Sequence, residues 1–174
     1  MIPVIGKQIA FFSLAVLFAS WILPLRTSAT AQPTILYVSD TTGADTTGDG
    51  SQSNPFATIT KAIQTANGSE GATAEIRVAS GTYTFTKEGG TIFMDDWESL
   101  YGGYAPDFST RDRNLYQTII DMQRVSTILV ASNNTTIDGF ILQNGYGSTT
   151  GGVYLTEKAS FAFSSTLTLS HFTP

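Results

Sequence analysis

The feature that most constrains the fold is a long series of short apolar segments separated by turn-forming residues. Runs of about four to eight residues, rich in β-branched and aromatic side chains, alternate with Gly, Asn, Asp and Ser. Runs of this kind are typical of β-strands. We predict strands in segments 34–39, 74–86, 91–94, 99–104, 117–122, 126–131, 134–145, 151–156 and 165–172. Within 74–86, alternation predicts inward side chains at Ile76, Val78, Tyr83 and Phe85.

Two of the later segments are similar to one another, which indicates a repeated structure. TIDGFI at 136–141 aligns with TLSHFT at 168–173, and this alignment pairs Ile137 with Leu169 at an offset of 32 residues. One such match is weak by itself. Together with strands that recur at intervals without intervening helices, it predicts coils stacked as a solenoid.

The segment 55–66 has the periodicity of a helix. Its apolar residues recur at spacings of three and four and form one stripe. Asn54 suits the N-cap, Pro55 suits the first helical position, and Gly68 follows as a C-terminal stop. We predict a helix over 55–66 with an inward stripe of Phe56, Ile59, Ile63 and Ala66.

Residues 1–31 differ in character from the rest of the chain. Lys7 precedes the apolar stretch 9–25, and Ala29-Thr30-Ala31 is a small-residue cleavage pattern. This order is typical of a secretory signal peptide. The alternative is a retained membrane anchor, because a 17-residue stretch can just span a bilayer. We predict a secreted or cell-surface protein with 32–174 as the mature chain and no membrane span after cleavage.

Charge and cysteine content exclude several classes of protein. The chain has 9 basic and 14 acidic residues, a formal charge of −5. An acidic surface repels phosphate backbones, so we do not expect nucleic acid as a partner. The chain has no cysteine, which excludes disulfides and thiolate metal sites, and one histidine cannot supply a multi-histidine metal centre.

The order of the motifs resembles that of a known group of proteins. GSQSNPFATITKAIQTA at 50–66, followed by IRVASGTYT at 76–84, resembles the entry segment of secreted right-handed parallel β-helix repeat proteins, the pectate-lyase-like superfamily. SLYGGYAPDFSTRDRN at 99–114 and TTIDGFILQNGYG at 135–147 resemble their first coils. The resemblance implies an all-β, right-handed parallel β-helix in which the helix caps the first coil. It specifies no activity, because members include polysaccharide lyases, hydrolases and bacterial surface proteins.

Candidate glycan-binding residues lie in one loop and one turn. Asp107, Arg111, Asp112 and Arg113 can form a carboxylate–guanidinium site for acidic sugars, and the simpler interpretation is a scaffold corner held by a few ion pairs. Trp97 lies among acidic residues, where an indole face can stack on a sugar. The alternative for Trp97 is partial burial in a solvated acidic turn.

A candidate cation site lies in the glycine-rich loop after the first predicted strand. Asp40, Asp45 and Asp49 are spaced 5 and 4 residues apart, and carboxylate oxygens are the ligands that Ca²⁺ prefers. The loop lacks the ligand register of an EF-hand, so an ordinary turn is the alternative. Ca²⁺ is the one cofactor that the sequence suggests.

We expect a non-catalytic protein that binds glycans or other surfaces, or that has a structural role. The alternative is a fragment of a polysaccharide lyase or glycoside hydrolase of the β-helix fold. The resemblance implies that such lyases use a Lys or Arg base beside calcium-binding Asp residues on later coils. Lys158 is the one lysine late in the chain and has no Asp near it in the sequence, so we predict no catalytic residue.

The sequence ends within strand-like alternation, at LTLSHFTP. We therefore expect 32–174 to form the N-terminal cap and first coils of a longer β-helix. Leu167, Leu169 and Phe172 would lie on an uncovered last coil. Because an uncovered strand edge can pair with another chain, we expect end-to-end self-association or aggregation of this chain.

Overall fold

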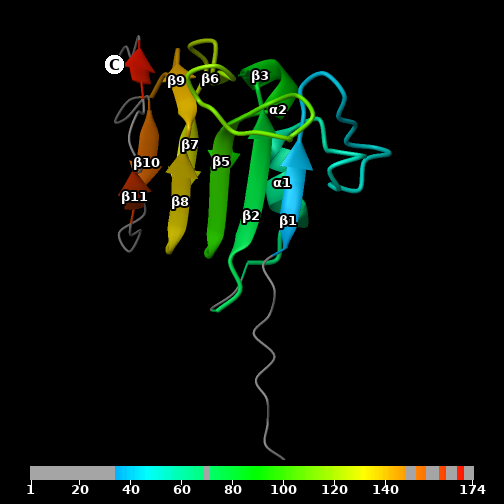
Figure 1. The fold of residues 1–174 in the computed structure, drawn as a ribbon. Helices are drawn as coiled ribbons and strands as arrows, with labels where there is room; N and C mark the ends of the chain where they lie inside the picture. Colours follow the sequence, from blue (N-terminus) through cyan, green and yellow to red (C-terminus); the bar gives the residue numbers. More distant parts are fainter. Residues whose placement is uncertain (1–33, 69–70, 148–151, 156–160, 164–167, 171–174) are drawn as a thin grey trace, which may run out of the picture.

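The computed structural model describes residues 34–68, 71–147, 152–155, 161–163 and 168–170, and they form a parallel, mainly β fold (Figure 1). The strands lie in three parallel sheets. The first sheet has the order β1 (Ile35–Val38), β2 (Ala74–Ala79), β5 (Glu98–Tyr104), β8 (Thr135–Asp138) and β11 (Phe161–Phe163). The second has the order β10 (Val153–Leu155), β7 (Leu129–Ala131) and β4 (Ile92–Phe93). The third has the order β12 (Thr168–Ser170), β9 (Phe140–Gln143), β6 (Thr118–Asp121) and β3 (Gly81–Thr84).

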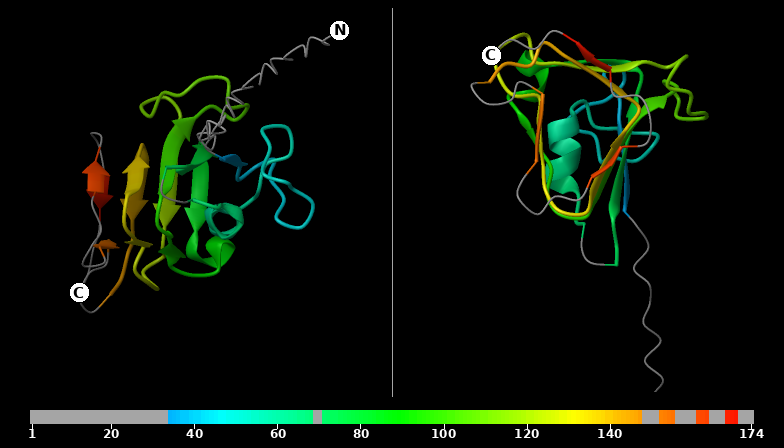
Figure 2. Two further views of the ribbon diagram at one scale, coloured as in Figure 1. Left: turned by 90° about the horizontal axis from the view of Figure 1, so that it is seen from below. Right: turned by 90° about the vertical axis from the view of Figure 1, so that its left-hand side faces the viewer.

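From β2 onward the chain visits the three sheets in rotation. β2 belongs to the first sheet, β3 to the third and β4 to the second, and β5 then returns to the first sheet beside β2. Parallel neighbours always need a crossover connection, and here the strands of the other two sheets supply it. In the right-hand view of Figure 2 the successive turns of the chain overlie one another around a common interior.

The predicted 32-residue alignment is wrong as a description of neighbouring coils. Ile137 pairs with Phe163, 26 residues later, and Leu169 pairs with Leu142, 27 residues earlier. In the other direction Ile137 pairs with Leu100, 37 residues earlier, because a long loop separates β5 from β6. The turns differ in length while the strands keep their register, so no single offset describes the repeat.

The core consists of the inward-facing side chains of the three sheets. In the first sheet Leu36, Ile76, Leu100 and Ile137 are partners in register and are all buried. The predicted inward positions Ile76, Val78 and Tyr83 are confirmed. Phe85 does not continue the strand: it begins the one-turn helix α2 (Phe85–Glu88) and is only partly buried against the core.

The predicted helix exists as α1 (Ile59–Thr65), which begins later than expected. The N-cap is Thr58 and not Asn54, and the Thr58 side chain accepts a hydrogen bond from the Lys61 amide. Phe56 instead pairs in parallel with Val38 at the edge of the first sheet. The Asp45 carboxylate accepts hydrogen bonds from the Ala57 and Thr58 amides, at 2.8 and 3.1 Å. These tertiary contacts hold the preceding residues extended, so they override the local preference for a helix start at Pro55.

α1 packs against β1, β2 and β4, and its buried residues Ile59, Ala62 and Ile63 join the core. The right-hand view of Figure 2 looks down the axis along which the coils stack. In this view α1 lies inside the outline that the coils form. Glu88 of α2 is buried at the start of α1 and accepts hydrogen bonds from the Ile59 and Thr60 amides, at 3.1 and 2.8 Å. Burial raises the pKa of Glu88, and these hydrogen bonds oppose the rise.

Neither helix in the described ranges has the length and apolar character that a membrane span requires. The predicted signal segment 1–31 lies outside the described residues, as do Lys158, Leu167 and Phe172.

Candidate functional site

The loop between β5 and β6, residues 105–117, folds back over the outer face of the first sheet. It crosses in front of β5 and β2 toward β1 in Figure 1. Phe108 of this loop is buried and packs edge-on against Tyr37 of β1, with ring centroids 4.9 Å apart. The Gln52 side chain donates a hydrogen bond to the Asp107 carbonyl at 3.0 Å, which links the loop to the segment before α1.

An ion-pair cluster holds the base of this loop. The Arg111 Nη2 atom lies 2.6 Å from Asp138 Oδ2, and the Arg113 Nη1 atom lies 2.9 Å from Asp138 Oδ1. Asp138, at the end of β8, is only 6% exposed. Arg111 also donates from Nε to the Gly102 carbonyl at 2.8 Å. We call Arg111, Arg113 and Asp138 the arginine clamp, because they fasten the loop to the next coil.

Replacing Asp138 with alanine is expected to release the loop. A nearly buried carboxylate that two guanidinium groups contact is costly to remove, so we expect a loss of about 2–4 kcal/mol in the free energy of unfolding. Trypsin should then cleave the folded protein after Arg111 and Arg113. Urea unfolding and timed proteolysis measure both effects. Asp112→Ala is the matched control: Asp112 is exposed, and its carboxylate accepts the Asn114 and Leu115 amides of its own turn. Equal resistance of the two variants to trypsin would contradict this role of Asp138.

The outer face of the first sheet carries a row of aromatic and charged side chains. Tyr37, Arg77, Tyr101 and Asp138 are successive partners in register on β1, β2, β5 and β8. The Arg77 guanidinium lies 5.7 Å from the Tyr37 ring centroid, and the Arg111 guanidinium lies 5.2 Å from the Tyr101 ring centroid. Cations at these distances are attracted to the ring faces. The two arginines therefore restrict the rotation of the two tyrosine rings.

A shallow depression lies beside this row. Thr73, Glu75, Ser99 and Tyr101 line it, and it opens to solvent. Arg77 donates to Glu75 at 2.6 Å and so holds one carboxylate oxygen in place. The depression combines a partly exposed phenol ring, a carboxylate and hydroxyl groups. A ring face can stack on the apolar face of a sugar, and the polar groups can bond its hydroxyls.

Three of the five predicted glycan-binding residues, Arg111, Asp112 and Arg113, line one open depression, and Asp107 and Trp97 do not. Arg111 and Arg113 meet at Asp138, which the sequence reasoning missed. Asp107 accepts hydrogen bonds from the Ser109 amide and hydroxyl, which lower the pKa of its carboxyl group. The Asp112 carboxylate accepts the Asn114 amide within the same loop, at 2.9 Å. Trp97 is partly buried next to Glu98, the first residue of β5, and its amide donates to the Asn133 carbonyl.

The three predicted calcium ligands have separate partners. Asp40 forms an ion pair with Lys87, Asp45 binds the amides before α1, and Asp49 accepts a hydrogen bond from the Ser51 amide at 2.9 Å. Among the described residues, no group of three or more acidic or histidine side chains is arranged to hold a metal ion. Calcium binding at Asp40, Asp45 and Asp49 stays a prediction, and the structure assigns each carboxylate a contact of its own.

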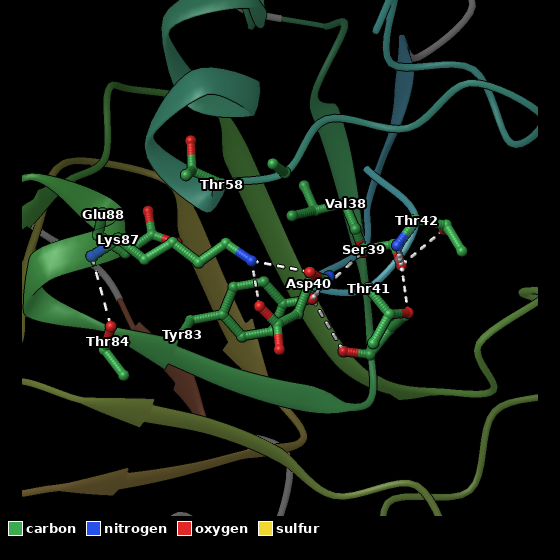
Figure 3. A network of polar contacts seen from close by, with 12 residues as sticks. Val38, Ser39, Asp40, Thr41, Thr42, Thr58, Tyr83, Thr84, Lys87 and Glu88 are labelled. Carbon is green, nitrogen blue, oxygen red and sulfur yellow. Dashed lines mark hydrogen bonds and ion pairs between the residues drawn. The ribbon is translucent and has the colours of Figure 1, made fainter. Parts of the chain in front are cut away.

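Asp40 belongs to a polar network around the buried Tyr83 (Figure 3). The Asp40 amide donates to the Tyr83 hydroxyl at 3.1 Å, and the hydroxyl donates to the Ala79 carbonyl at 3.1 Å. Lys87 reaches the Asp40 carbonyl at 2.8 Å from the other side. Burial raises the pKa of Tyr83, so the phenol stays protonated and serves as both donor and acceptor.

Tyr83→Phe is expected to lower the free energy of unfolding by about 1–3 kcal/mol, because it leaves the partly buried Asp40 amide and the buried Ala79 carbonyl without this partner. Tyr146→Phe is the control, since the side chain of Tyr146 is exposed. Urea denaturation of both variants measures the difference. A loss for Tyr83→Phe no larger than that for the control would show that the network does not stabilise the fold.

The acidic turn before β5 contains two carboxylates in different environments. Asp96 is exposed and accepts hydrogen bonds from the Asn133 amide and the Ser132 hydroxyl, which lower the pKa of Asp96. Glu98 is 1% exposed, and burial raises the pKa of Glu98 to about 7. Its Oε2 atom accepts the Asp95 amide at 2.9 Å. Although a pKa near 7 suits acid–base chemistry, the burial of Glu98 keeps the group away from any large substrate.

Comparison with known families gives one match. A family model described as "Protein of unknown function (DUF1565)" matches residues 41–171, about three quarters of the chain. Comparison with curated proteins gave no match, and comparison with solved structures gave none.

Proposed function

We propose a function from the premise that the chain belongs to the DUF1565 family of proteins of unknown function. The chain forms a right-handed parallel β-helix, and α1 caps its first coil. The rotation of the chain through three parallel sheets supports the β-helix. Crossovers between parallel strands of one sheet are right-handed in almost all proteins, which supports the hand. The packing of α1 against β1, β2 and β4 supports its role as a cap.

We further propose that the protein is secreted or held at the cell surface and binds a glycan without cleaving it. The main support for glycan binding is the depression on the outer face of the first sheet, where Tyr101 lies beside Glu75, Ser99 and Thr73. Tyr101 supplies the ring face, and Glu75 accepts hydrogen bonds from sugar hydroxyls. The segment 1–31 supports secretion by its sequence pattern alone.

The rigidity of the site supports a binding role. Arg111 faces the Tyr101 ring and is itself fastened to Asp138, and Arg77 holds Glu75. Binding a flexible side chain to a ligand costs conformational entropy, and side chains that are already held in place reduce that cost. A flat sheet face with an open depression also fits an extended polymer better than a small molecule, which needs a deep pocket.

The test is affinity gel electrophoresis of the full chain against a panel of neutral and acidic polysaccharides. We expect retardation by at least one polysaccharide and about tenfold weaker binding for Tyr101→Ala. Tyr146→Ala is the matched control, because Tyr146 is an exposed tyrosine that does not line the depression. Retardation that is equal in wild type and Tyr101→Ala would refute the proposed site.

The same panel tests the enzymatic alternative, a polysaccharide lyase or glycoside hydrolase. Each polysaccharide is incubated with the protein in the presence and absence of Ca²⁺, and new reducing ends or unsaturated products are measured. Binding without product supports the proposal. Release of product, abolished by a single carboxylate substitution, would replace it with the enzymatic function. N-terminal sequencing of protein recovered from the medium tests secretion, and we expect Gln32 as the first residue.

A further inference from the structure

The outer face of the second sheet carries an apolar row that the first site does not use. Phe93 of β4, Val130 of β7 and Tyr154 of β10 are partners in register. Phe93 is 63% exposed and Tyr154 is 47% exposed, while the residues beside them on the inner face, Ile92 and Leu129, are fully buried. We propose that this row, which we call the second-sheet platform, binds a neutral polysaccharide whose chain runs across the strands.

The spacing of the two rings is the first argument. Neighbouring strands of a sheet lie about 4.8 Å apart, so rings on β4 and β10, two strands apart, stand roughly 9.6 Å from each other. That distance is close to the length of a disaccharide unit in an extended β-1,4-linked chain. Two sugar rings of the same orientation can therefore stack on Phe93 and Tyr154, with the intervening sugar over Val130.

The charge around the platform is the second argument, and it selects the class of glycan. β4, β7 and β10 contain no charged residue. The turn that follows β4 adds Asp95 and Asp96, both exposed. Within the described residues the platform therefore combines apolar rings with negative charge, which disfavours polyanions such as polyuronates. Neutral sugars offer apolar C–H faces for the rings and hydroxyls that can donate to the two carboxylates.

The platform is independent of the depression at Tyr101, which lies on a different sheet. The arginines of the first site are absent from the strands of the second sheet. The two faces therefore make different predictions about ligand charge and about which substitution abolishes binding, and either proposal can fail without the other.

The test is affinity gel electrophoresis of the full chain in hydroxyethyl cellulose and in glucomannan, with polygalacturonate as the acidic comparison. We expect wild type to be retarded by a neutral polymer, with about tenfold weaker binding for Phe93→Ala and for Tyr154→Ala. Leu115→Ala is the control, because Leu115 is a similarly exposed apolar residue on the β5–β6 loop. Circular dichroism should show all three variants folded, since each side chain is exposed.

Four results would overturn the proposal. The first is no retardation of wild type by either neutral polymer, and the second is unchanged retardation of Phe93→Ala. The third comes from light scattering: self-association of wild type that Phe93→Ala abolishes would assign the row to contacts between two copies of the chain. The fourth is a loss of neutral-polymer binding in Tyr101→Ala while Phe93→Ala binds as wild type does, which would support the first site and reject the platform.

Discussion

Gly139→Ala is expected to lower the free energy of unfolding by about 3–5 kcal/mol, a large part of the roughly 5–15 kcal/mol that stabilises an ordinary domain. A Cβ atom at Gly139 would lie 2.6 Å from the Gly102 carbonyl oxygen and 2.8 Å from Arg111 Nη2. The backbone there has φ of +84°, which side-chain-bearing residues rarely adopt. Gly102 and Gly139 are neighbours on successive coils, so the added methyl group would push two coils apart and displace the arginine clamp.

Gly89→Ala separates the two causes. Gly89 has a similar φ of +78°, and nothing lies within 4 Å of a Cβ atom placed there. This control carries the backbone cost alone, about 1 kcal/mol. Urea unfolding of both variants measures the difference. Equal losses would show that backbone conformation, and not the close approach of the coils, makes glycine necessary at 139.

Glu98→Gln is expected to stabilise the protein by about 3 kcal/mol at pH 8 and to leave its stability nearly unchanged at pH 4. Burial raises the pKa of Glu98 from 4.5 to about 7 in the folded state. Between these values the folded state binds more protons than the unfolded state, so the stability of wild type falls as the pH rises from about 4.5 to about 7. Glutamine stays neutral, and its side-chain oxygen can still accept the Asp95 amide.

The measurement is the difference in the free energy of unfolding between variant and wild type at pH 4, 6 and 8. Other titrating groups, including the buried Glu88, are common to both proteins and cancel in this difference. Asp107→Asn is the control. The pKa of Asp107 is lowered, so its contribution is lost only as the pH falls below about 4, and the difference should be flat between pH 5 and 8. A flat profile for Glu98→Gln would show that its carboxyl group titrates normally.

The inward pattern of the strands is readable in the sequence, because burial on one face imposes alternation. Four residue pairs align in the first sheet: Leu36-Tyr37, Ile76-Arg77, Leu100-Tyr101 and Ile137-Asp138. The second residue of each pair faces outward, so the sequence contains a signal for the proposed binding face. Recognising this signal requires the offset that pairs Leu100 with Ile137. The long β5–β6 loop makes that offset irregular, so the sequence alone does not reveal it.

Features that depend on contacts distant in sequence were not predictable. Asp138 binds two arginines 25 and 27 residues earlier, and no local pattern links them. The start of α1 depends on Asp45, which is 12 residues before the first amide that it binds. The sequence around Pro55 has the local features of a helix start. In the folded protein, however, Phe56 pairs with Val38 and the helix begins only at Ile59. Trp97 and Asp107 have side chains suited to sugar binding, but local turns hold them apart from the clamp.

Chemical-shift mapping by NMR tests directly whether a glycan binds to the outer face of the first sheet. An oligosaccharide of the polymer that retards the full chain is titrated into ¹⁵N-labelled protein. The proposal predicts saturable shifts of the amides of Glu75, Arg77, Ser99 and Tyr101, with no such shifts in Tyr101→Ala. Saturable shifts confined to other faces, or no shifts at saturating oligosaccharide, would contradict it.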